Sequence, residues 1–210
     1  MRPLTLATPK PLLHVAGRSL LEHQIRRLRD AGLRKLVINA AYLAQQILNE
    51  LDRIDLAGVE CYVSIEEQAL ETGGGILRAL PYLGDAPFLL INSDVWIDID
   101  LRSLVERSWP HESLAHLVLV PNPEHYPEGD FGLIEGRCCT DADIRYTYSG
   151  LSIISPALIH EFAPSSEGFP LGPLLRAAMV EQRVSGELYT GTWSDIGTPE
   201  RLAALRNRLE

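Results

Sequence analysis

Residues 88–94 read Phe-Leu-Leu-Ile-Asn-Ser-Asp, an apolar run that passes directly into three polar residues. A short apolar run of this kind predicts a strand that is buried on both faces. Ligands of open α/β sheets bind beyond the carboxyl ends of the strands, so the polar residues lie where a site is expected. We predict that Asn92 hydrogen-bonds a substrate and that Asp94 binds Mg²⁺ through a carboxylate oxygen. The alternative is that Asp94 only forms a turn.

Strands and helices alternate on both sides of this run. The elements predicted before it are a helix from the N-cap Ser19 to Gly32, a strand over 35–39, a helix near 43–51, a strand over 60–65 and a helix after the glycines at 73–75. Those predicted directly after it are a helix over 101–109 and a strand over 116–120. Such alternation is typical of right-handed βαβ units. It predicts a Rossmann-like α/β fold with a mostly parallel central sheet and helices on both faces.

The C-terminal half predicts mixed strands. Residues 121–130 contain three prolines and form an expected exposed loop, at the place where an insertion or lid would sit. The elements that follow are strands over 131–135 and 146–154, helices over 156–162 and 171–181, a strand near 193–196 and a helix opened by Pro199. There is no internal repeat, and we expect a single domain over residues 1–210.

The charge balance limits the partners of the protein. The chain has 28 acidic and 19 basic residues, which gives a formal net charge of −9. A negative chain is not drawn to a phosphate backbone or an anionic membrane, so nucleic acid and membrane are not expected as partners. A phosphorylated substrate would require a local cation or a divalent metal.

Lys10 is one of only two lysines in a chain that otherwise uses arginine for its positive charges. Pro9 and Pro11 restrict the backbone on both sides of it, so the ammonium is presented from a stiff, extended segment. An ammonium held in this way can bind a phosphate oxygen. The alternative is a solvated lysine in a proline-rich loop.

Two further segments carry polar groups next to predicted helices. The stretch 71–75, Glu-Thr-Gly-Gly-Gly, lacks the dinucleotide pattern G-x-G-x-x-G, but its glycines would let a base or an anion approach backbone N–H groups near a helix N-terminus. A flexible turn is the alternative. Asp195 precedes the helix opened by Pro199, where its carboxylate could supply a second protein ligand for Mg²⁺ or form a local turn.

The cysteines and the apolar runs indicate the compartment. Cys61 stands alone and Cys138 and Cys139 are adjacent, a spacing that fits neither a zinc site nor a disulfide framework, so reduced and non-catalytic thiols are expected. No apolar run approaches the roughly 18 residues of a membrane span, and no signal-peptide pattern opens the chain. We expect a cytoplasmic protein.

Four motifs, taken in order, resemble one family. They are R-P-L-T-x-x-x-P-K-P-L from residue 2, L-E-T-G-G-G from residue 70, N-S-D-V-W from residue 92 and W-x-D-I-G-T-P-E-R-L from residue 193. Their order and spacing are similar to those of the sugar-1-phosphate nucleotidyltransferases, over essentially the whole chain. The resemblance implies the Rossmann-like nucleotide-diphospho-sugar transferase fold.

The resemblance also implies roles for the matching residues. Lys10 would bind the nucleotide phosphates and steady charge in the transition state, while Asp94 and Asp195 would hold Mg²⁺. Lys10 and Asp94 are thus the catalytic candidates. The other implied positions are Glu71, Thr72, Gly73 and Gly74 beside the base, Asn92 at the sugar phosphate, and Asp130 and Gly150 at the sugar, in a sugar-binding portion around 121–155.

The implied reaction is attack by an oxygen of a sugar 1-phosphate on the α-phosphorus of UTP, with release of pyrophosphate. N-acetylmuramic acid 1-phosphate, in cell-wall sugar recycling, is the expected acceptor; mannose, heptose or glucose phosphates with another nucleotide are the alternatives. Two other classes remain open. A glycosyltransferase would use a finished sugar nucleotide but usually carries D-x-D, whereas Val95 and Trp96 follow Asp94. A nucleotide-sensing relative would have no activity.

The sequence departs from the family pattern at the N-terminus. Family members carry a hydrophobic strand and an L-A-A-G-x-G-x-R segment before M-R-P-L-T, the point at which this sequence begins. We expect the working protein to contain that strand and its phosphate-binding loop. The alternative is a truncated, inactive relative. As given, the chain is expected to bind UTP weakly and to turn over poorly.

Overall fold

The computed structural model describes residues 1, 4–107 and 112–209 of the 210-residue chain, and Trp109, the expected end of a helix, lies outside them. Contacts divide the chain into two compact units. Unit 1 comprises Met1–Gln68, Ser93–Glu106 and Thr192–Glu210, and unit 2 comprises Ala69–Asn92 and Arg107–Gly191. The chain therefore passes between the units four times. Neither unit is a continuous stretch of sequence.

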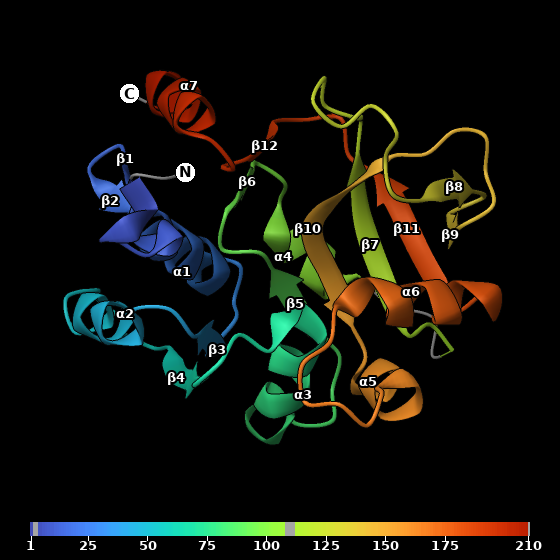
Figure 1. Ribbon diagram of the computed structural model, residues 1–210, viewed down its shortest axis with the longest axis horizontal. Helices are drawn as coiled ribbons and strands as arrows, with labels where there is room; N and C mark the ends of the chain where they lie inside the picture. Colours follow the sequence, from blue (N-terminus) through green and yellow to red (C-terminus); the bar gives the residue numbers. More distant parts are fainter. Residues whose placement is uncertain (2–3, 108–111, 210) are drawn as a thin grey trace. The chain divides into compact units, whose positions relative to one another are not determined.

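Unit 1 begins with a short hairpin and a long amphipathic helix (Figure 1). Helix α1 (Leu20–Asp30) starts where the Ser19 hydroxyl accepts a hydrogen bond from the backbone N–H of Glu22 at 3.1 Å, the expected N-cap. The remaining elements of unit 1 are the 3-10 turns η1 (Leu4–Leu6) and η2 (Lys10–Leu12), strands β1 (His14–Val15), β2 (Arg18–Ser19), β3 (Lys35–Ala40), β4 (Glu60–Ile65), β6 (Val95–Ile97) and β12 (Trp193–Asp195), and helices α2 (Ala44–Leu51), α4 (Leu101–Glu106) and α7 (Pro199–Leu209).

Two strand pairs form the framework of unit 1. Strands β3 and β4 are parallel and connected through α2, whereas β6 and β12 are antiparallel although they lie about a hundred residues apart in sequence. The core that supports β12 consists of buried aliphatic side chains from the hairpin region, α1 and α7: Leu13, Val15, Leu20, Ile196, Leu202 and Leu205. Burial of these side chains holds the end of β12 in place against β6.

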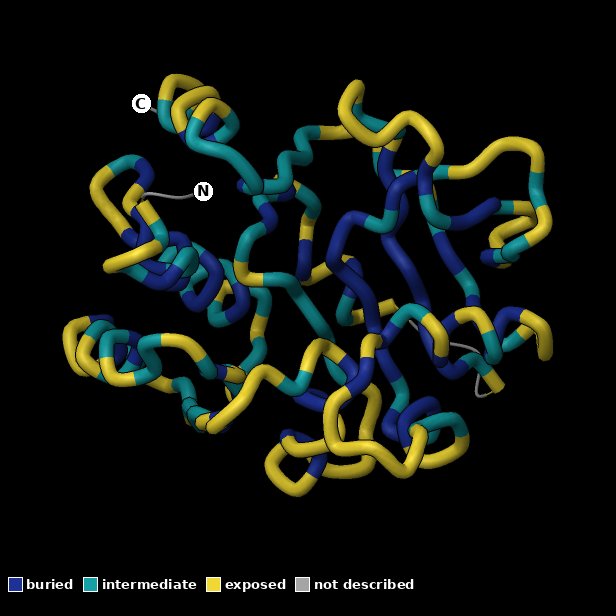
Figure 2. Tube along the Cα trace, in the orientation of Figure 1, coloured by how far each residue is buried: buried dark blue, intermediate teal, exposed yellow. Residues whose placement is uncertain are grey.

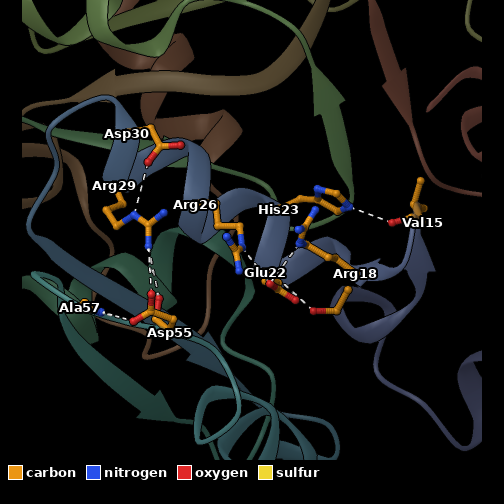
Figure 3. A network of polar contacts seen from close by, with 10 residues as sticks. Val15, Arg18, Glu22, His23, Arg26, Arg29, Asp30, Asp55 and Ala57 are labelled. Carbon is orange, nitrogen blue, oxygen red and sulfur yellow. Dashed lines mark hydrogen bonds and ion pairs between the residues drawn. The ribbon is translucent and has the colours of Figure 1, made fainter. Parts of the chain in front are cut away.

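The exposed face of α1 carries a row of charged side chains (Figure 3). Glu22 accepts from Arg26 at 2.8 Å and lies 3.3 Å from Arg18, both at the i,i+4 spacing of a helix surface. Arg29 pairs with Asp30 next to it and, at 3.8 Å, with Asp55 in the loop before β4. In each of these pairs one side chain keeps at least 35% of its surface exposed to solvent, so the pair contributes little stability.

Unit 2 is one six-stranded sheet with three helices packed against it and against one another (Figure 1). The strand order is β5 (Phe88–Ile91), β10 (Thr147–Ile154), β7 (Ala115–Val120), β11 (Val184–Leu188), β9 (Arg137–Cys139) and β8 (Gly132–Ile134). The helices are α3 (Glu71–Leu83), α5 (Pro156–Phe162) and α6 (Leu171–Val180). All residues of β7 are buried, as expected for a central strand (Figure 2).

The α/β class is confirmed, and most predicted elements are present within a residue or two of their expected ends. The expectation of a mostly parallel sheet is wrong in detail, because only β7 and β11 are parallel neighbours in the six-stranded sheet. Strands β8 to β10 follow one another through turns instead of helices, and a turn returns the chain in the opposite direction. Strands β1, β2, β6, β9 and β11 were not predicted.

The three cysteines, Cys61, Cys138 and Cys139, are free thiols, as expected. Burial raises the pKa of Cys138 to about 12, so this thiol stays protonated and unreactive at neutral pH. None of the helices in the described part of the chain has both the length and the apolar character needed to cross a bilayer.

Candidate active site

Lys10 and Asp94, 84 residues apart in sequence, meet in unit 1. The Lys10 ammonium donates to Asp94 Oδ2 at 2.6 Å, and the two side chains keep 28% and 36% of their surface exposed. Lys10 opens η2 behind Pro9, a short turn rather than the expected extended segment, and the rigid turn presents the side chain. The pair is half-exposed, so incoming ligands can reach both charges.

The loop that carries Lys10 is held by α2 and the residues before it. The Tyr42 hydroxyl donates to the carbonyl of Leu6 at 2.7 Å, and the Gln46 side-chain amide donates to the carbonyl of Ala7 at 2.9 Å. These two bonds fix the backbone just ahead of the Pro9-Lys10-Pro11 turn. A lysine on a fixed turn loses less entropy when it binds a ligand.

Asp195 lies next to Asp94 in the same unit, because β6 and β12 pair. Asp195 is opposite Val95 in the register, and the backbone N–H of Ile196 donates to the carbonyl of Asp94 at 2.7 Å. The pairing brings together the backbone positions of two carboxylates that are 101 residues apart in the sequence. Asp94, just before β6, and Asp195, at the end of β12, therefore have neighbouring backbone positions.

Arg201 on α7 pairs with Asp195 and was not singled out from the sequence. Its guanidinium donates to both carboxylate oxygens of Asp195. Gly197 makes room for this contact, because a side chain there would meet the guanidinium. No local sequence pattern marks this pair, because an arginine on a helix surface looks the same in the sequence whether or not it meets a carboxylate in space.

The donor set suits a hard divalent cation. Mg²⁺ prefers oxygen ligands, and it commonly takes only one or two protein carboxylates while water and phosphate oxygens complete its octahedron. Asp94 and Asp195 offer two carboxylates at a half-exposed position, and each is already balanced by a cationic side chain. Within the described residues no cluster of three or more acidic, histidine or cysteine side chains gathers around one point. The residues present therefore fit a Mg²⁺ that is shared with a phosphorylated ligand.

A cavity of about 620 Å³ opens beside Lys10 in unit 1. Pro9 and Lys10 line one part of it, Asn39 and Tyr42 from the end of β3 and the following loop line another, and Gly197 reaches it from the β12 side. This volume lies within the usual range of small-molecule sites. Lys10 thus joins the acidic pair to a space large enough for a ligand.

The glycine stretch lies inside a helix, which corrects the expectation that the helix begins after residue 75. Helix α3 starts at Glu71, so Gly73 and Gly74 occupy its first turn while Glu71 and Thr72 are exposed at its end. The glycines pack against residues 167–169: a side chain at Gly73 would lie 2.5 Å from the Phe169 ring, and one at Gly74 would overlap the carbonyl of Glu167. Close packing of two backbones therefore requires these glycines, whether or not a ligand binds.

The three predicted sugar positions come together in unit 2. The backbone N–H of Asn92 donates to the carbonyl of Gly150 at 2.8 Å. Gly150 lies at an irregularity of β10, with a positive φ of 82° that favours glycine. Asp130 Oδ2 accepts from the backbone N–H of Tyr148, two residues before Gly150, at 2.8 Å. One hydrogen bond therefore links Asp130 to β10 two residues before the bulge at Gly150. The other links the bulge to Asn92 at the end of β5.

Two tyrosines complete the surroundings of Asp130. Tyr126 donates its hydroxyl to Asp130 Oδ1 at 3.0 Å, and Tyr148 shares a 2.7 Å hydrogen bond with Ser152. Burial raises the pKa of Tyr148 to about 12, so its phenol stays protonated. Tyr126 comes from the predicted exposed loop. An aromatic residue among the prolines of that loop is the sequence signal that could have indicated it.

The predicted residues fall into two groups. Lys10, Asp94 and Asp195 belong to unit 1, and the other seven predicted positions, Glu71, Thr72, Gly73, Gly74, Asn92, Asp130 and Gly150, belong to unit 2. Within unit 1, Lys10 pairs with Asp94 and lines the cavity, while Asp195 pairs with Arg201 at the end of the strand that pairs with β6. Within unit 2 the sugar positions form one hydrogen-bonded group, and the glycine stretch forms the start of α3.

Comparison with known proteins finds a family model and relatives that match most of this chain. The family model described as nucleotidyl transferase matches residues 1–144. The chain is 43% identical, over 96% of its length and 90% of the other, to an N-acetylmuramate alpha-1-phosphate uridylyltransferase of Neisseria meningitidis serogroup B. It is 33% identical, over 95% of its length, to a mannose-1-phosphate guanylyltransferase catalytic subunit beta of Drosophila pseudoobscura pseudoobscura, of which it covers 56%.

Solved structures agree on the fold. HddC of Yersinia pseudotuberculosis, crystallised with GMP-PN, superimposes with a TM-score of 0.78 over 97% of this chain and 91% of the other, at 20% sequence identity. At this identity the likeness establishes the architecture and leaves the chemistry to the side chains.

Proposed function

The chain belongs to the nucleotidyl transferase family, and from that premise we propose that it transfers a uridylyl group from UTP to a sugar 1-phosphate, forming a UDP-sugar and pyrophosphate. We propose N-acetylmuramic acid 1-phosphate as the acceptor, because the Neisseria relative is named for that substrate. The corresponding role is the recycling of cell-wall sugar. Because such recycling draws on UTP, we propose the cytoplasm as its compartment.

One observation carries the proposal: the Lys10–Asp94 contact of 2.6 Å beside the strand pair that holds Asp195. A half-exposed pair of a cation and a carboxylate, with a second aspartate on the neighbouring strand, supplies the groups that transfer between phosphates requires. The carboxylates suit Mg²⁺, and the ammonium suits a phosphate oxygen. In a chain with a net charge of −9, this cluster is where a polyphosphate could be accepted.

The reaction needs positioning and charge neutralisation more than covalent chemistry. An oxygen of the sugar 1-phosphate attacks the α-phosphorus of UTP in line, the bond to the β-phosphate oxygen breaks, and pyrophosphate leaves with both electrons of that bond. Lys10 would hold its ammonium donors on the phosphate oxygens as charge builds up. Mg²⁺, when bound by Asp94 and Asp195, supplies the positive charge that neutralises the triphosphate.

Unit 2 would provide recognition. Asn92 would donate to the sugar phosphate, and Asp130 and the bulge at Gly150 would meet sugar hydroxyls. Glu71, Thr72 and the glycines at the start of α3 would border the base through first-turn N–H groups that no helix carbonyl accepts, apart from that of Gly74, which donates to the carbonyl of Phe169. We propose residues 121–155 as the sugar-binding portion of one nucleotidyltransferase domain.

A pyrophosphate-release assay tests the proposed activity. The full-length protein is incubated with Mg²⁺, UTP and, separately, the 1-phosphates of N-acetylmuramic acid, N-acetylglucosamine, glucose and mannose. We expect the fastest release with N-acetylmuramic acid 1-phosphate and UTP. No pyrophosphate with any sugar phosphate would overturn the transferase proposal.

A second candidate is guanylyl transfer to mannose 1-phosphate, which the Drosophila relative favours. The same assay separates the two when GTP, ATP and CTP replace UTP. Faster release with GTP and mannose 1-phosphate than with UTP and any sugar would favour this candidate.

A further inference from the structure

Arg176 on α6 is an exposed arginine held against an aromatic ring. Its guanidinium carbon lies 5.3 Å from the centre of the Phe131 ring, and Phe131 itself is 97% buried. A guanidinium in contact with a ring face is attracted by the π electrons and is restricted in orientation. Its N–H groups point outward in the plane of the guanidinium, so the stacking contact leaves its hydrogen-bond donors available.

The ring on which this arginine lies belongs to the residue that follows Asp130, one of the proposed sugar positions. Phe131 follows directly after Asp130, whose two carboxylate oxygens accept from Tyr126 and from the backbone of Tyr148. The positive charge of Arg176 also acts on the Tyr126 phenol, lowering its pKa against the larger, raising effects of burial and Asp130. Arg176 and Asp130 therefore lie within electrostatic range of the same phenol.

Two other arginines of unit 2 are already paired with carboxylates. Arg107 pairs with Glu187 at 2.6 Å, and Arg183 pairs with Glu161 and Glu181. Among the residues that the structure describes, Arg176 has no carboxylate within ion-pair distance. It is thus a preoriented cation whose donors are not used by another acidic side chain of the described protein.

The charge at this position has a consequence for the substrate. Asp130 is a good acceptor for sugar hydroxyls, but its carboxylate repels an acceptor sugar that is itself acidic. N-acetylmuramic acid differs from N-acetylglucosamine only by a lactyl ether on O3, which ends in a carboxylate. A site that binds this sugar next to Asp130 must supply a cation, and a guanidinium binds a carboxylate through two parallel hydrogen bonds.

We propose that Arg176 binds the lactyl carboxylate of the acceptor and thereby selects N-acetylmuramic acid 1-phosphate over sugar phosphates without an acidic group. The proposal rests on the proposed function and names the residue that determines its sugar specificity. Arg176 takes no part in the transfer between phosphates. Its loss is therefore expected to change the choice of sugar and to leave the phosphate chemistry intact.

The test compares two acceptors that differ only in the lactyl group. Values of kcat/KM are measured with N-acetylmuramic acid 1-phosphate and N-acetylglucosamine 1-phosphate for the wild type, Arg176→Gln and Arg176→Lys. Arg78→Gln is the matched control, because Arg78 is an exposed arginine on α3 in the same unit and stacks on no ring among the described residues. Calorimetric binding of the two UDP-sugar products gives a second readout that does not depend on turnover.

We expect Arg176→Gln to lower kcat/KM for the muramic acid substrate about 10- to 100-fold and to change it less than about twofold for N-acetylglucosamine 1-phosphate. Arg176→Lys should restore part of the preference, because the charge stays and the planar fork is lost. Binding of UDP-N-acetylmuramic acid should weaken in parallel, while Arg78→Gln behaves as the wild type.

Three results would overturn this inference. Equal losses with both sugars would indicate a phosphate-binding or structural role, and no loss with either sugar would exclude contact with the lactyl group. In both cases an active wild type leaves the proposed function standing. A wild type that releases pyrophosphate with neither sugar, and binds neither product, would overturn the proposed function and this inference together.

Discussion

Lys10 is the residue on which the proposed chemistry depends most directly. In the structure its ammonium neutralises Asp94, and in the reaction it would neutralise phosphate oxygens. We expect Lys10→Met to lower kcat about 10²- to 10³-fold, because a preorganised donor to developing charge is lost. The KM for the sugar phosphate should change less than about threefold. Steady-state kinetics with UTP and N-acetylmuramic acid 1-phosphate measure both, and a kcat near that of the wild type would contradict a phosphate role for Lys10.

The two aspartates are expected to act as a pair. Asp94→Asn or Asp195→Asn should weaken Mn²⁺ binding, measured by electron paramagnetic resonance, at least about tenfold, because an amide is a poorer ligand than a carboxylate. Mg²⁺-dependent turnover should fall with it, while the far-ultraviolet circular dichroism stays unchanged. Asp85→Asn, at an exposed turn of unit 2, is the control. Wild-type Mn²⁺ affinity in both variants would show that the ligands are misassigned.

His116 on β7 provides a test of stability against pH. Burial is the largest cause that lowers its pKa to about 4, and Ser185 contacts its Nδ1 at 2.9 Å. The unfolded chain, with a pKa near 6.5, takes up this proton first, so stability is lost as the pH falls from about 6.5 towards 4. His116→Gln should therefore lose about 1–2 kcal/mol less than the wild type between pH 7 and pH 5.

Urea unfolding of the wild type and His116→Gln at pH 7 and pH 5 measures this difference. Carboxylates far from His116 affect both proteins equally and cancel in the comparison, whereas Glu187, which lies 3.7 Å from His116 Nε2 and raises the His116 pKa, contributes to the measured difference. The same pH dependence in both proteins would mean that His116 is not held neutral in the folded state.

Individual residues also show how much of the candidate site could be predicted from the sequence. Lys10, Asp94 and Asp195 could be named as candidates because a lysine held between prolines, and acids at the ends of strands, lie where a ligand can bind. Arg201 and Arg176 were not, because an arginine on a helix has no local pattern that distinguishes a surface charge from a partner in space. Their roles depend on contacts with Asp195 and Phe131, which only the folded chain brings about.

The glycines of α3 act at the scale of the element. A side chain at Gly74 would overlap the carbonyl of Glu167, and this part of the backbone cannot move as a flexible side chain would. We expect Gly74→Ala to destabilise the fold by about 1–3 kcal/mol despite its better helix propensity. Gly168→Ala is the control, because its nearest neighbour would lie at 3.6 Å. Thermal unfolding measures both, and equal midpoints for Gly74→Ala and the wild type would contradict the packing role.

Elements were predictable where the local pattern is strong. The ranges of β4 and α5 match the expected ones, and α7 begins at Pro199 as expected, because these ends are marked by a turn or by proline. The strands that were missed are short, such as β9, or carry a glycine and charge within them, as β11 does. The antiparallel placement of β10 between β5 and β7 depends on pairing across long sequence separations, which periodicity does not encode.

At the scale of the whole molecule, the chain distributes the proposed task over two discontinuous units. Unit 1 contributes the cation, the two carboxylates and the cavity, and unit 2 contributes the hydrogen-bonded sugar positions and Arg176. The motif order in the sequence was sufficient to predict the family and its fold. It could not predict this division, because each unit is assembled from segments that are far apart in the sequence.

The central claim is that the sugar phosphate attacks UTP and displaces pyrophosphate. The most direct test uses N-acetylmuramic acid 1-phosphate labelled with ¹⁸O in its phosphate, together with UTP, Mg²⁺ and the full-length protein, and follows the products by ³¹P nuclear magnetic resonance and mass spectrometry. The account predicts equal amounts of UDP-N-acetylmuramic acid that carries all of the label and of pyrophosphate that carries none. Label in the pyrophosphate, or no UDP-sugar at all, would contradict it.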